Sequence, residues 1–262
     1  MKPATLFIRL TILTGGLLGL WALIVYLTDA PPYILPSPLS VVRAWWVYRS
    51  GLLENAGITA VEIISGLILG SLLGLLCALV MISLRSARRW LLPLLVISQA
   101  IPVFALAPVL VLWLGYGMAS KIAMAVLIIF FPVAASFYDG LRRTETGWLD
   151  MAHVMTGGQR FRLQRILWFI RIPAALPPMA SGLRVATAVA PIGAVVGEWV
   201  GSSAGLGYMM LHASGRAQAD VMFAALLSLV VMAVGLYSLV DIVLRRALPW
   251  QADTLKLQED IL

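Results

Sequence analysis

Apolar residues dominate this chain in six long blocks, which shorter polar or glycine-rich intervals separate. A helix needs about 20 apolar residues to cross the hydrocarbon core of a bilayer, so each block predicts one membrane-spanning helix. The six predicted spans cover residues 10–27, 57–82, 90–114, 120–138, 178–200 and 222–243. The pattern therefore predicts an all-α membrane protein that forms a single transmembrane domain over residues 1–262.

Composition and charge agree with this interpretation. Hydrophobic residues make up 61% of the chain and charged residues 12%, and the mean hydropathy is +0.95. A net charge of +7 could indicate a nucleic-acid partner in a soluble protein. Here, however, 14 of the 19 Lys and Arg residues fall in the intervals that six spans would place inside, and four fall in outside intervals or at the outer end of a span. The positive-inside rule then predicts that both termini are cytoplasmic, and no nucleic-acid partner is expected.

Two intervals, residues 29–56 and 202–220, are predicted to lie on the periplasmic side. In the first, Ser37 is a suitable N-cap for a short interfacial helix whose first residue is Pro38. In the second, a short helix is expected at residues 209–213 between glycine-rich turns.

The second span carries a stripe of small residues. Gly66, Gly70 and Gly74 are four residues apart, so they share one face of the helix. Small residues at this spacing allow another helix to approach closely, which predicts a packing face. Glu62 lies near the outer end of the same span, where a snorkelling or interfacially paired carboxylate is expected.

Prolines interrupt the third span at Pro93, Pro102 and Pro108, which predicts a kink or a break. Ser98 and Gln99 lie beside the predicted break. Broken helices in transporters often flank the solute pathway, so both residues are candidate pathway residues. A kinked structural helix is the alternative interpretation.

The fifth span contains two ionisable residues, which are costly at membrane depth and usually face a cavity or a partner. Arg184 lies near the cytoplasmic end and is either a snorkelling anchor or a pathway residue. Glu198 lies towards the outside among small residues. It is either a polar group at an outer gate or an interfacial carboxylate bonded to a neighbouring helix.

The longest polar interval, residues 139–178, lies between the fourth and fifth spans and holds six arginines. Such a basic interval is expected in the cytoplasm. A short helix is predicted to start over residues 149–154. The pair Gly157 and Gly158 is expected to break it, and Pro173 is expected to end a second part. A short exposed helix under a membrane domain is a suitable docking surface for a soluble partner.

This interval resembles the cytoplasmic "EAA" loop of permease subunits of bacterial ABC importers. That loop begins with an acidic residue and two alanines, continues with a glycine, and ends in a hydrophobic-x-hydrophobic-Pro pattern. The corresponding ATPase-coupling positions here are Asp150, Met151, Ala152, Gly157, Gly158 and Pro173. Asp replaces Glu, Met replaces the first Ala, and the interval is about one helical turn longer. Which of Thr156, Gly157 and Gly158 matches the family glycine stays open.

The resemblance implies a type I ABC importer permease fold in the bacterial inner (plasma) membrane. It implies that the loop helix docks onto cytoplasmic ABC ATPase subunits, that a second permease copy pairs with the first, and that a periplasmic solute-binding protein delivers the solute. No cofactor or metal is expected. The sequence contains no GxxxxGK[ST] phosphate loop or other catalytic motif, so the chain is expected to be non-catalytic, with ATP hydrolysis on a separate chain.

The solute is indicated by two further stretches. The pattern at residues 35–38, Leu-Pro-Ser-Pro, resembles the nitrate, sulfonate, taurine and thiamine-precursor branch of the family. Residues 190–226 are similar to permeases for thiamine pyrimidine precursors, which implies a solute of the hydroxymethylpyrimidine type. A taurine, alkanesulfonate or nitrate permease is the first alternative. A secondary transporter without an ATPase and a membrane scaffold without a solute path are two others.

Overall fold

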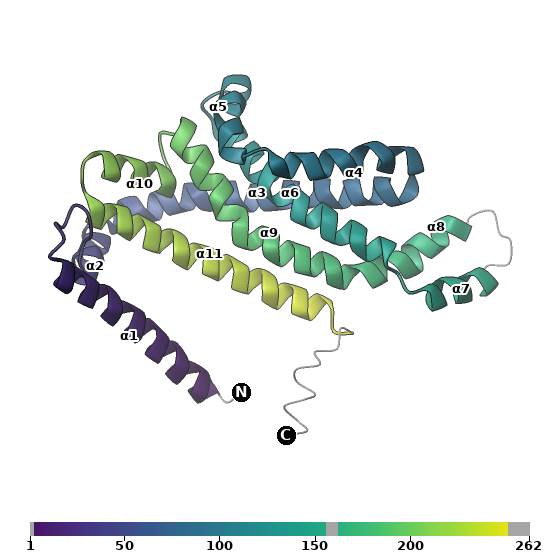
Figure 1. The fold of residues 1–262 in the computed structure, drawn as a ribbon, viewed down its shortest axis with the longest axis horizontal. Helices are drawn as coiled ribbons and strands as arrows, with labels where there is room; N and C mark the ends of the chain where they lie inside the picture. Colours follow the sequence, from purple (N-terminus) through teal and green to yellow (C-terminus); the bar gives the residue numbers. More distant parts are fainter. Residues whose placement is uncertain (1–2, 156–161, 251–262) are drawn as a thin grey trace. The chain divides into compact units, whose positions relative to one another are not determined.

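The structure, a computed structural model, describes residues 3–155 and 162–250, and every regular element in these ranges is a helix (Figure 1). The helices are α1 (Pro3–Thr28), α2 (Pro38–Val47), α3 (Arg49–Ser83), α4 (Arg85–Ala100), α5 (Val103–Leu114), α6 (Met118–Arg142), α7 (Thr146–Met155), α8 (Arg162–Ile166), the π-helix η1 (Leu167–Arg171), α9 (Ile172–Gly201), α10 (Leu206–Gly215) and α11 (Ala219–Ala247). The chain forms two compact units, of which the first comprises Met1–Ala60 with Ser202–Met232 and the second Val61–Gly201 with Ala233–Leu262. Helices α3 and α11 each run through both units, and the prediction of one domain stays a prediction.

The number of spans agrees with the sequence pattern. In the described part of the chain, five helices are long and apolar enough to cross a membrane, namely α1, α3, α6, α9 with its N-terminal extension, and α11. The helices α4 and α5 together make a sixth candidate, bent by 103°. This confirms the prediction of about six spans and of a break in the third.

The break in the third span lies at Ile101 and Pro102. Ile101 has an extended backbone, with φ −84° and ψ 119°, as expected for a residue that precedes proline. Pro93 and Pro108, by contrast, lie inside α4 and α5 without ending either helix. Only one of the three prolines therefore breaks the span.

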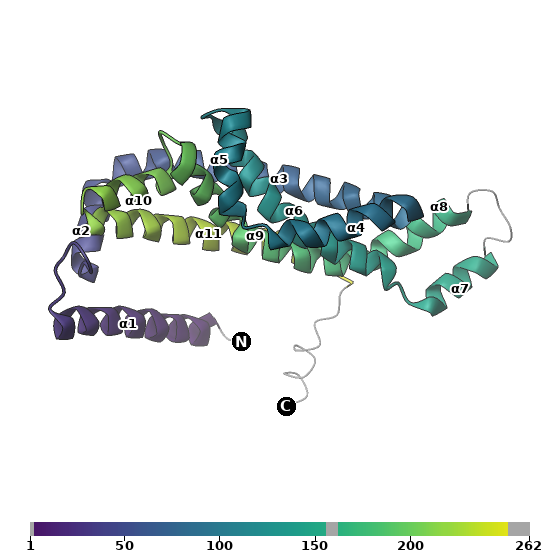
Figure 2. The same ribbon diagram turned by 45° about the horizontal axis from the view of Figure 1, so that its top comes forward.

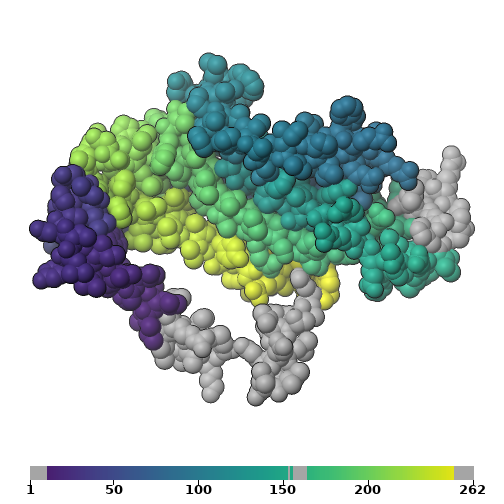
Figure 3. Space-filling view, viewed as in Figure 1, coloured from purple at the N-terminus to yellow at the C-terminus, as the bar shows by residue number. Residues whose placement is uncertain are grey.

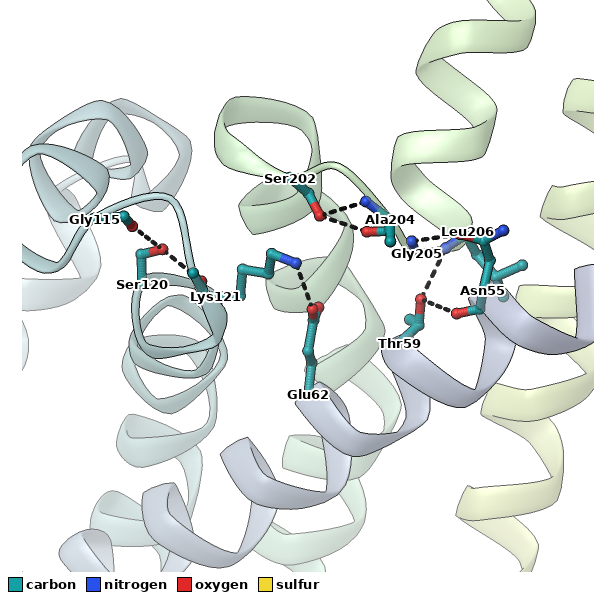
Figure 4. Close-up of polar contacts among 11 residues, drawn as sticks. Asn55, Thr59, Glu62, Gly115, Ser120, Lys121, Ser202, Ala204, Gly205 and Leu206 are labelled. Atoms are coloured by element: carbon teal, nitrogen blue, oxygen red, sulfur yellow. Dashed lines mark hydrogen bonds and ion pairs between the residues drawn. The ribbon is translucent and has the colours of Figure 1, made fainter. Parts of the chain in front are cut away.

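In the first unit, the sequence signals for two short helices are confirmed. The Ser37 side chain accepts a hydrogen bond of 3.2 Å from the backbone N–H of Ser40 and so caps α2. Helix α10 includes the predicted residues 209–213 and extends on both sides. Its start is held by α3, because Gly205 N–H donates to Asn55 Oδ1 at 2.6 Å and Leu206 N–H donates to Thr59 Oγ1 at 2.9 Å (Figure 4).

In the second unit, α6 lies between α3 and α9, and glycines make both contacts close. A Cβ atom added to Gly66 on α3 would overlap the Ala125 side chain of α6. A Cβ added to Gly193 on α9 would lie 2.7 Å from Ala125 Cα. Gly70 and Gly74 continue the contact of α3 with α6. The predicted small-residue packing face is thus confirmed, with α6 as its partner.

The interval between the fourth and fifth spans is more helical than the sequence suggested. Helix α7 contains the predicted short helix at residues 149–154, while Gly157 and Gly158 lie outside the described residues. The prediction that Pro173 ends a helix is wrong, because α8, η1 and α9 follow one another without interruption from Arg162 to Gly201. The fifth span accordingly begins before residue 178.

The π-helical turn explains why Pro173 is tolerated. Proline lacks the N–H that would bond the carbonyl four residues earlier, and its ring presses against that carbonyl. The turn of η1 is wider, and the Ile172 N–H bonds the carbonyl of Leu167, five residues back. Pro173 directly follows this turn as the second residue of α9.

A glycine exchange tests the close contact of α3 with α6. Replacing Gly66 with Leu should destabilise the protein by about 1–3 kcal/mol, because the added side chain has no room against Ala125. The measurement is thermal unfolding of the purified protein in detergent. The control is Gly235→Leu in α11, where nothing lies within 4 Å of an added Cβ. Equal unfolding temperatures for the two variants would contradict the packing described here.

Candidate functional site

Three charged side chains are buried inside the second unit, on α3, α6 and α9. Lys121 Nζ lies 2.9 Å from Glu62 Oε1, and the two side chains point toward each other (Figure 4). The Glu198 carboxyl interacts with that of Glu62. The exposed fractions are 0% for Glu62, 7% for Lys121 and 1% for Glu198. We call Glu62, Lys121 and Glu198 the ionic cluster.

The glycine contacts explain why these charges meet. Glu62 precedes Gly66 on α3 by one helical turn, and Lys121 precedes Ala125 on α6 by one turn. On α9, Gly197 lies so close to α6 that an added Cβ would be 3.1 Å from Lys121 Cα. The three backbones therefore approach closely near these residues. Glu62 and Lys121 lie one turn before the contact and Glu198 lies next to Gly197, so their side chains are close together.

The ionic cluster is costly to form and costly to break. Moving a charge out of water costs several kcal/mol, and a close opposite charge offsets that cost. Removing one partner leaves the other buried and uncompensated. The ionic cluster therefore fixes the relative positions of α3, α6 and α9 at this level.

Sequence reasoning singled out Glu198 but missed its partners. Glu62 was expected to snorkel or to pair at the interface, and Lys121 was not singled out, yet both are buried. A similar predicted depth in the membrane could have indicated their contact, because all three residues lie at the outer ends of their predicted spans. The Glu198 carboxyl interacts with that of Glu62 on α3, and its role at a gate stays a prediction.

Arg184 has a partner of its own on α11. Its Nε lies 2.6 Å from Asp241 Oδ1, and Arg245 Nε lies 2.8 Å from Asp241 Oδ2. Ala180, Leu244 and other apolar side chains pack around this contact between α9 and α11. Arg184 therefore joins two helices within the second unit, apart from the ionic cluster.

Ser98 and Gln99 lie at the C-terminal end of α4, just before the break, and they face different grooves. The Ser98 hydroxyl donates to the Leu95 carbonyl at 2.7 Å, and its groove has a volume of about 260 Å³. Gln99 faces a groove of about 530 Å³ between α4–α5, α6 and α9. Apolar side chains such as Phe131 and Ile192 form most of that second groove.

Helix α7 presents an apolar stripe that no other described element covers. Trp148, Met151 and Met155 are three, then four residues apart, and their exposed fractions are 55%, 47% and 77%. Asp150 is exposed on a different face of the helix, whereas Ala152, one turn after Trp148, is buried next to the stripe. Figure 3 shows the teal surface of this part of the chain open on the face in view.

The described residues offer no site for a metal ion of the usual kind. Within residues 3–155 and 162–250, no three His, Cys, Asp or Glu side chains come together as a metal-binding group.

Comparison with known proteins gives a consistent picture. The family model described as "Binding-protein-dependent transport system inner membrane component" matches residues 70–249. A Haemophilus influenzae protein named "Probable ABC transporter permease protein" is 53% identical over 237 residues, covering 90% of this chain and 94% of the relative. The "Formylaminopyrimidine transport permease protein ThiX" of Halalkalibacterium halodurans is 36% identical, covering 84% and 87%. Other matching relatives are named for riboflavin transport and for taurine transport.

A solved structure shares the fold. It is the inward-facing MetNI methionine ABC transporter, with a TM-score of 0.60, 21% identity and coverage of 77% of this chain and 96% of that chain. At this identity the likeness concerns the fold alone.

A double exchange tests the ionic cluster. Lys121→Met should destabilise the protein by about 3–5 kcal/mol, because it leaves buried carboxylates without their cation. Adding Glu62→Gln should restore part of the loss, since it removes one of those charges. Thermal unfolding in detergent measures both effects.

The matched control is an exposed ion pair in the same unit. Arg142 Nη2 lies 3.3 Å from Asp139 Oδ1, and the two side chains are 54% and 50% exposed. Arg142→Met should therefore cost less than about 1 kcal/mol. A Lys121→Met variant as stable as Arg142→Met would show that the ionic cluster does not hold the helices together.

Proposed function

The chain belongs to the binding-protein-dependent transport system inner membrane component family and is a permease subunit of an ABC importer; on that premise, we propose that it passes a thiamine pyrimidine precursor of the hydroxymethylpyrimidine type into the cytoplasm. It is a multi-pass protein of the inner membrane. Family membership sets aside the scaffold and secondary-transporter interpretations of the sequence. The proposal adds the solute, the partners and the roles of particular residues.

The observation that carries the solute proposal is the similarity to the formylaminopyrimidine permease over 84% of this chain. The groove beside Gln99 supports it. Its lining carries one amide and otherwise apolar side chains such as Phe104 and Val189. A flat, nearly neutral heterocycle can bind apolar and aromatic surfaces and needs few hydrogen-bond partners.

An anionic solute fits this groove less well. Two cations of the spans in the second unit, Lys121 and Arg184, are each engaged by a carboxylate. A sulfonate or nitrate in the groove beside Gln99 would lose its hydration, and no cation in the lining would compensate for that loss. A taurine or alkanesulfonate permease remains the second candidate, because relatives with taurine-transport names also match.

The proposed docking surface for the ATPase is helix α7. Its stripe of Trp148, Met151 and Met155 is an apolar face on a short helix, which suits a hydrophobic groove on a partner. Asp150 adds an exposed charge on another face of the same helix, and buried Ala152 anchors the helix to its own chain. Gly157 and Gly158 belong to the proposed surface by resemblance only.

A continuous helical run begins at Arg162 and leads into the membrane. α8, η1 and α9 extend without a break from Arg162 to Gly201, and Glu198 lies near the far end. In the proposed mechanism, movement of the docking surface is passed along this helical run to the ionic cluster. Pro173, behind the π-helical turn, is the proposed flexible point of that run. A second copy of the chain completes the proposed transporter, and a periplasmic binding protein delivers the solute.

Co-purification tests the docking surface. The tagged chain is expressed with the ATPase encoded beside it and purified in mild detergent. Met151→Glu and Asp150→Lys should lower ATPase recovery about tenfold or more, since each places a new charge in the contact. Glu54→Lys on α3 is the matched control, because it also reverses an exposed charge and should leave recovery unchanged. Full recovery with both α7 variants would remove α7 from the contact.

Binding measurements test the solute. The cognate periplasmic binding protein is purified and titrated with formylaminopyrimidine, hydroxymethylpyrimidine and taurine. We expect at least one pyrimidine to bind about a hundredfold more tightly than taurine, a difference of about 2.7 kcal/mol. Tight binding of taurine with none of either pyrimidine would refute the solute proposal and leave the permease assignment intact.

A further inference from the structure

An apolar groove of about 420 Å³ lies within the first unit, between α2, the first turns of α3 and α11. Its walls include Trp45, Leu53, Ala56, Leu227, Val231 and Met232. The polar groups in it are few. The Trp45 indole N–H donates to Ser228 Oγ at 3.0 Å, so these two groups satisfy each other. The remaining polar lining residue is Arg49.

The groove begins at the depth of the lipid headgroups. Trp45, Trp46 and Tyr48 are exposed at the junction of α2 and α3, and aromatic residues of this kind mark the membrane–water interface. Helix α3 starts at Arg49 and is apolar enough to span the membrane. From Arg49 to Ala56 the groove follows α3 for about 10 Å, at 1.5 Å per residue, from the interface towards the hydrocarbon.

Arg49 holds a defined position at the headgroup end of the groove. Its Nη1 donates to the Trp46 carbonyl at 2.9 Å, and its Cζ lies 4.8 Å from the centre of the Trp46 ring. Among the side chains that the structure describes, no carboxylate forms an ion pair with Arg49. A guanidinium has five N–H donors, so most of them stay available for an anion, and phosphate fits them in pairs.

We propose that this groove is a binding site for a phospholipid with an anionic headgroup, with one acyl chain along the groove and the phosphate on Arg49. The apolar walls match the first half of an acyl chain in polarity, and the cation lies where the phosphate of that lipid would be. A free phosphate ion would leave the apolar walls unused. A peptide segment would bury its backbone N–H and C=O groups against apolar walls, where Trp45 and Ser228 are already paired with each other.

Lipid retention by the full-length protein tests this site. The protein is purified in a delipidating detergent, titrated with phosphatidylglycerol and analysed by native mass spectrometry. Arg49→Gln should weaken binding of the tightest lipid about tenfold or more, the effect of losing a charged hydrogen-bond partner. Arg43→Gln is the matched control, because Arg43 is exposed on α2 and does not line the groove. Its lipid affinity should equal that of the unchanged protein.

A second variant tests the acyl-chain half of the site. Ala56→Phe should fill the groove and also weaken lipid binding, while the unfolding temperature stays near that of the unchanged protein. An equal loss of lipid affinity in Arg49→Gln and Arg43→Gln would show that only the general surface charge matters. That result would overturn the proposal. Displacement of the lipid by millimolar inorganic phosphate, or full binding by Ala56→Phe, would overturn the acyl-chain assignment.

Discussion

The close approach of α3 and α9 to α6 is the contact on which the second unit depends. Lipid tails are as apolar as the helices, so burial of apolar surface does little to hold membrane helices together. Packing and polar contacts must do so instead. Gly66 and Gly193 approach Ala125 from two sides, and Ala125 is fully buried. The ionic cluster exists because these three backbones are already close.

This arrangement gives the permease one long helical run with its two ends in different surroundings. One end of the run from Arg162 to Gly201 follows the exposed helix α7, and the other carries Glu198 among buried charges. Separating the buried charges of the ionic cluster would cost free energy, because each charge would lose its partner. A change of conformation must therefore move them together. Rigid helices with such contacts tend to move as bodies, which is the kind of motion that alternating access requires.

The sequence was informative where a local rule decided the structure. Apolar block length located the spans, Ser37 and Pro38 located the start of α2, and the glycine spacing on α3 located a packing face. The ionic cluster followed no local rule, because Glu62 and Lys121 lie in separate spans and meet only through helix register. The prediction that Pro173 ends a helix was wrong for a related reason. Proline stops a regular α-helix, but the preceding π-helical turn, which nothing in the sequence indicated, accommodates it.

The measurement that most directly tests the central conclusion is ATP hydrolysis by the reconstituted complex. The chain is placed in proteoliposomes with its ATPase, and liganded binding protein is added on the opposite face of the membrane. If the ATPase drives the permease through α7, ATP hydrolysis should rise severalfold when the liganded binding protein is added. Solute should enter the proteoliposomes only when ATP is present. Solute transport by the chain without the ATPase, or hydrolysis that ignores the binding protein, would contradict this conclusion.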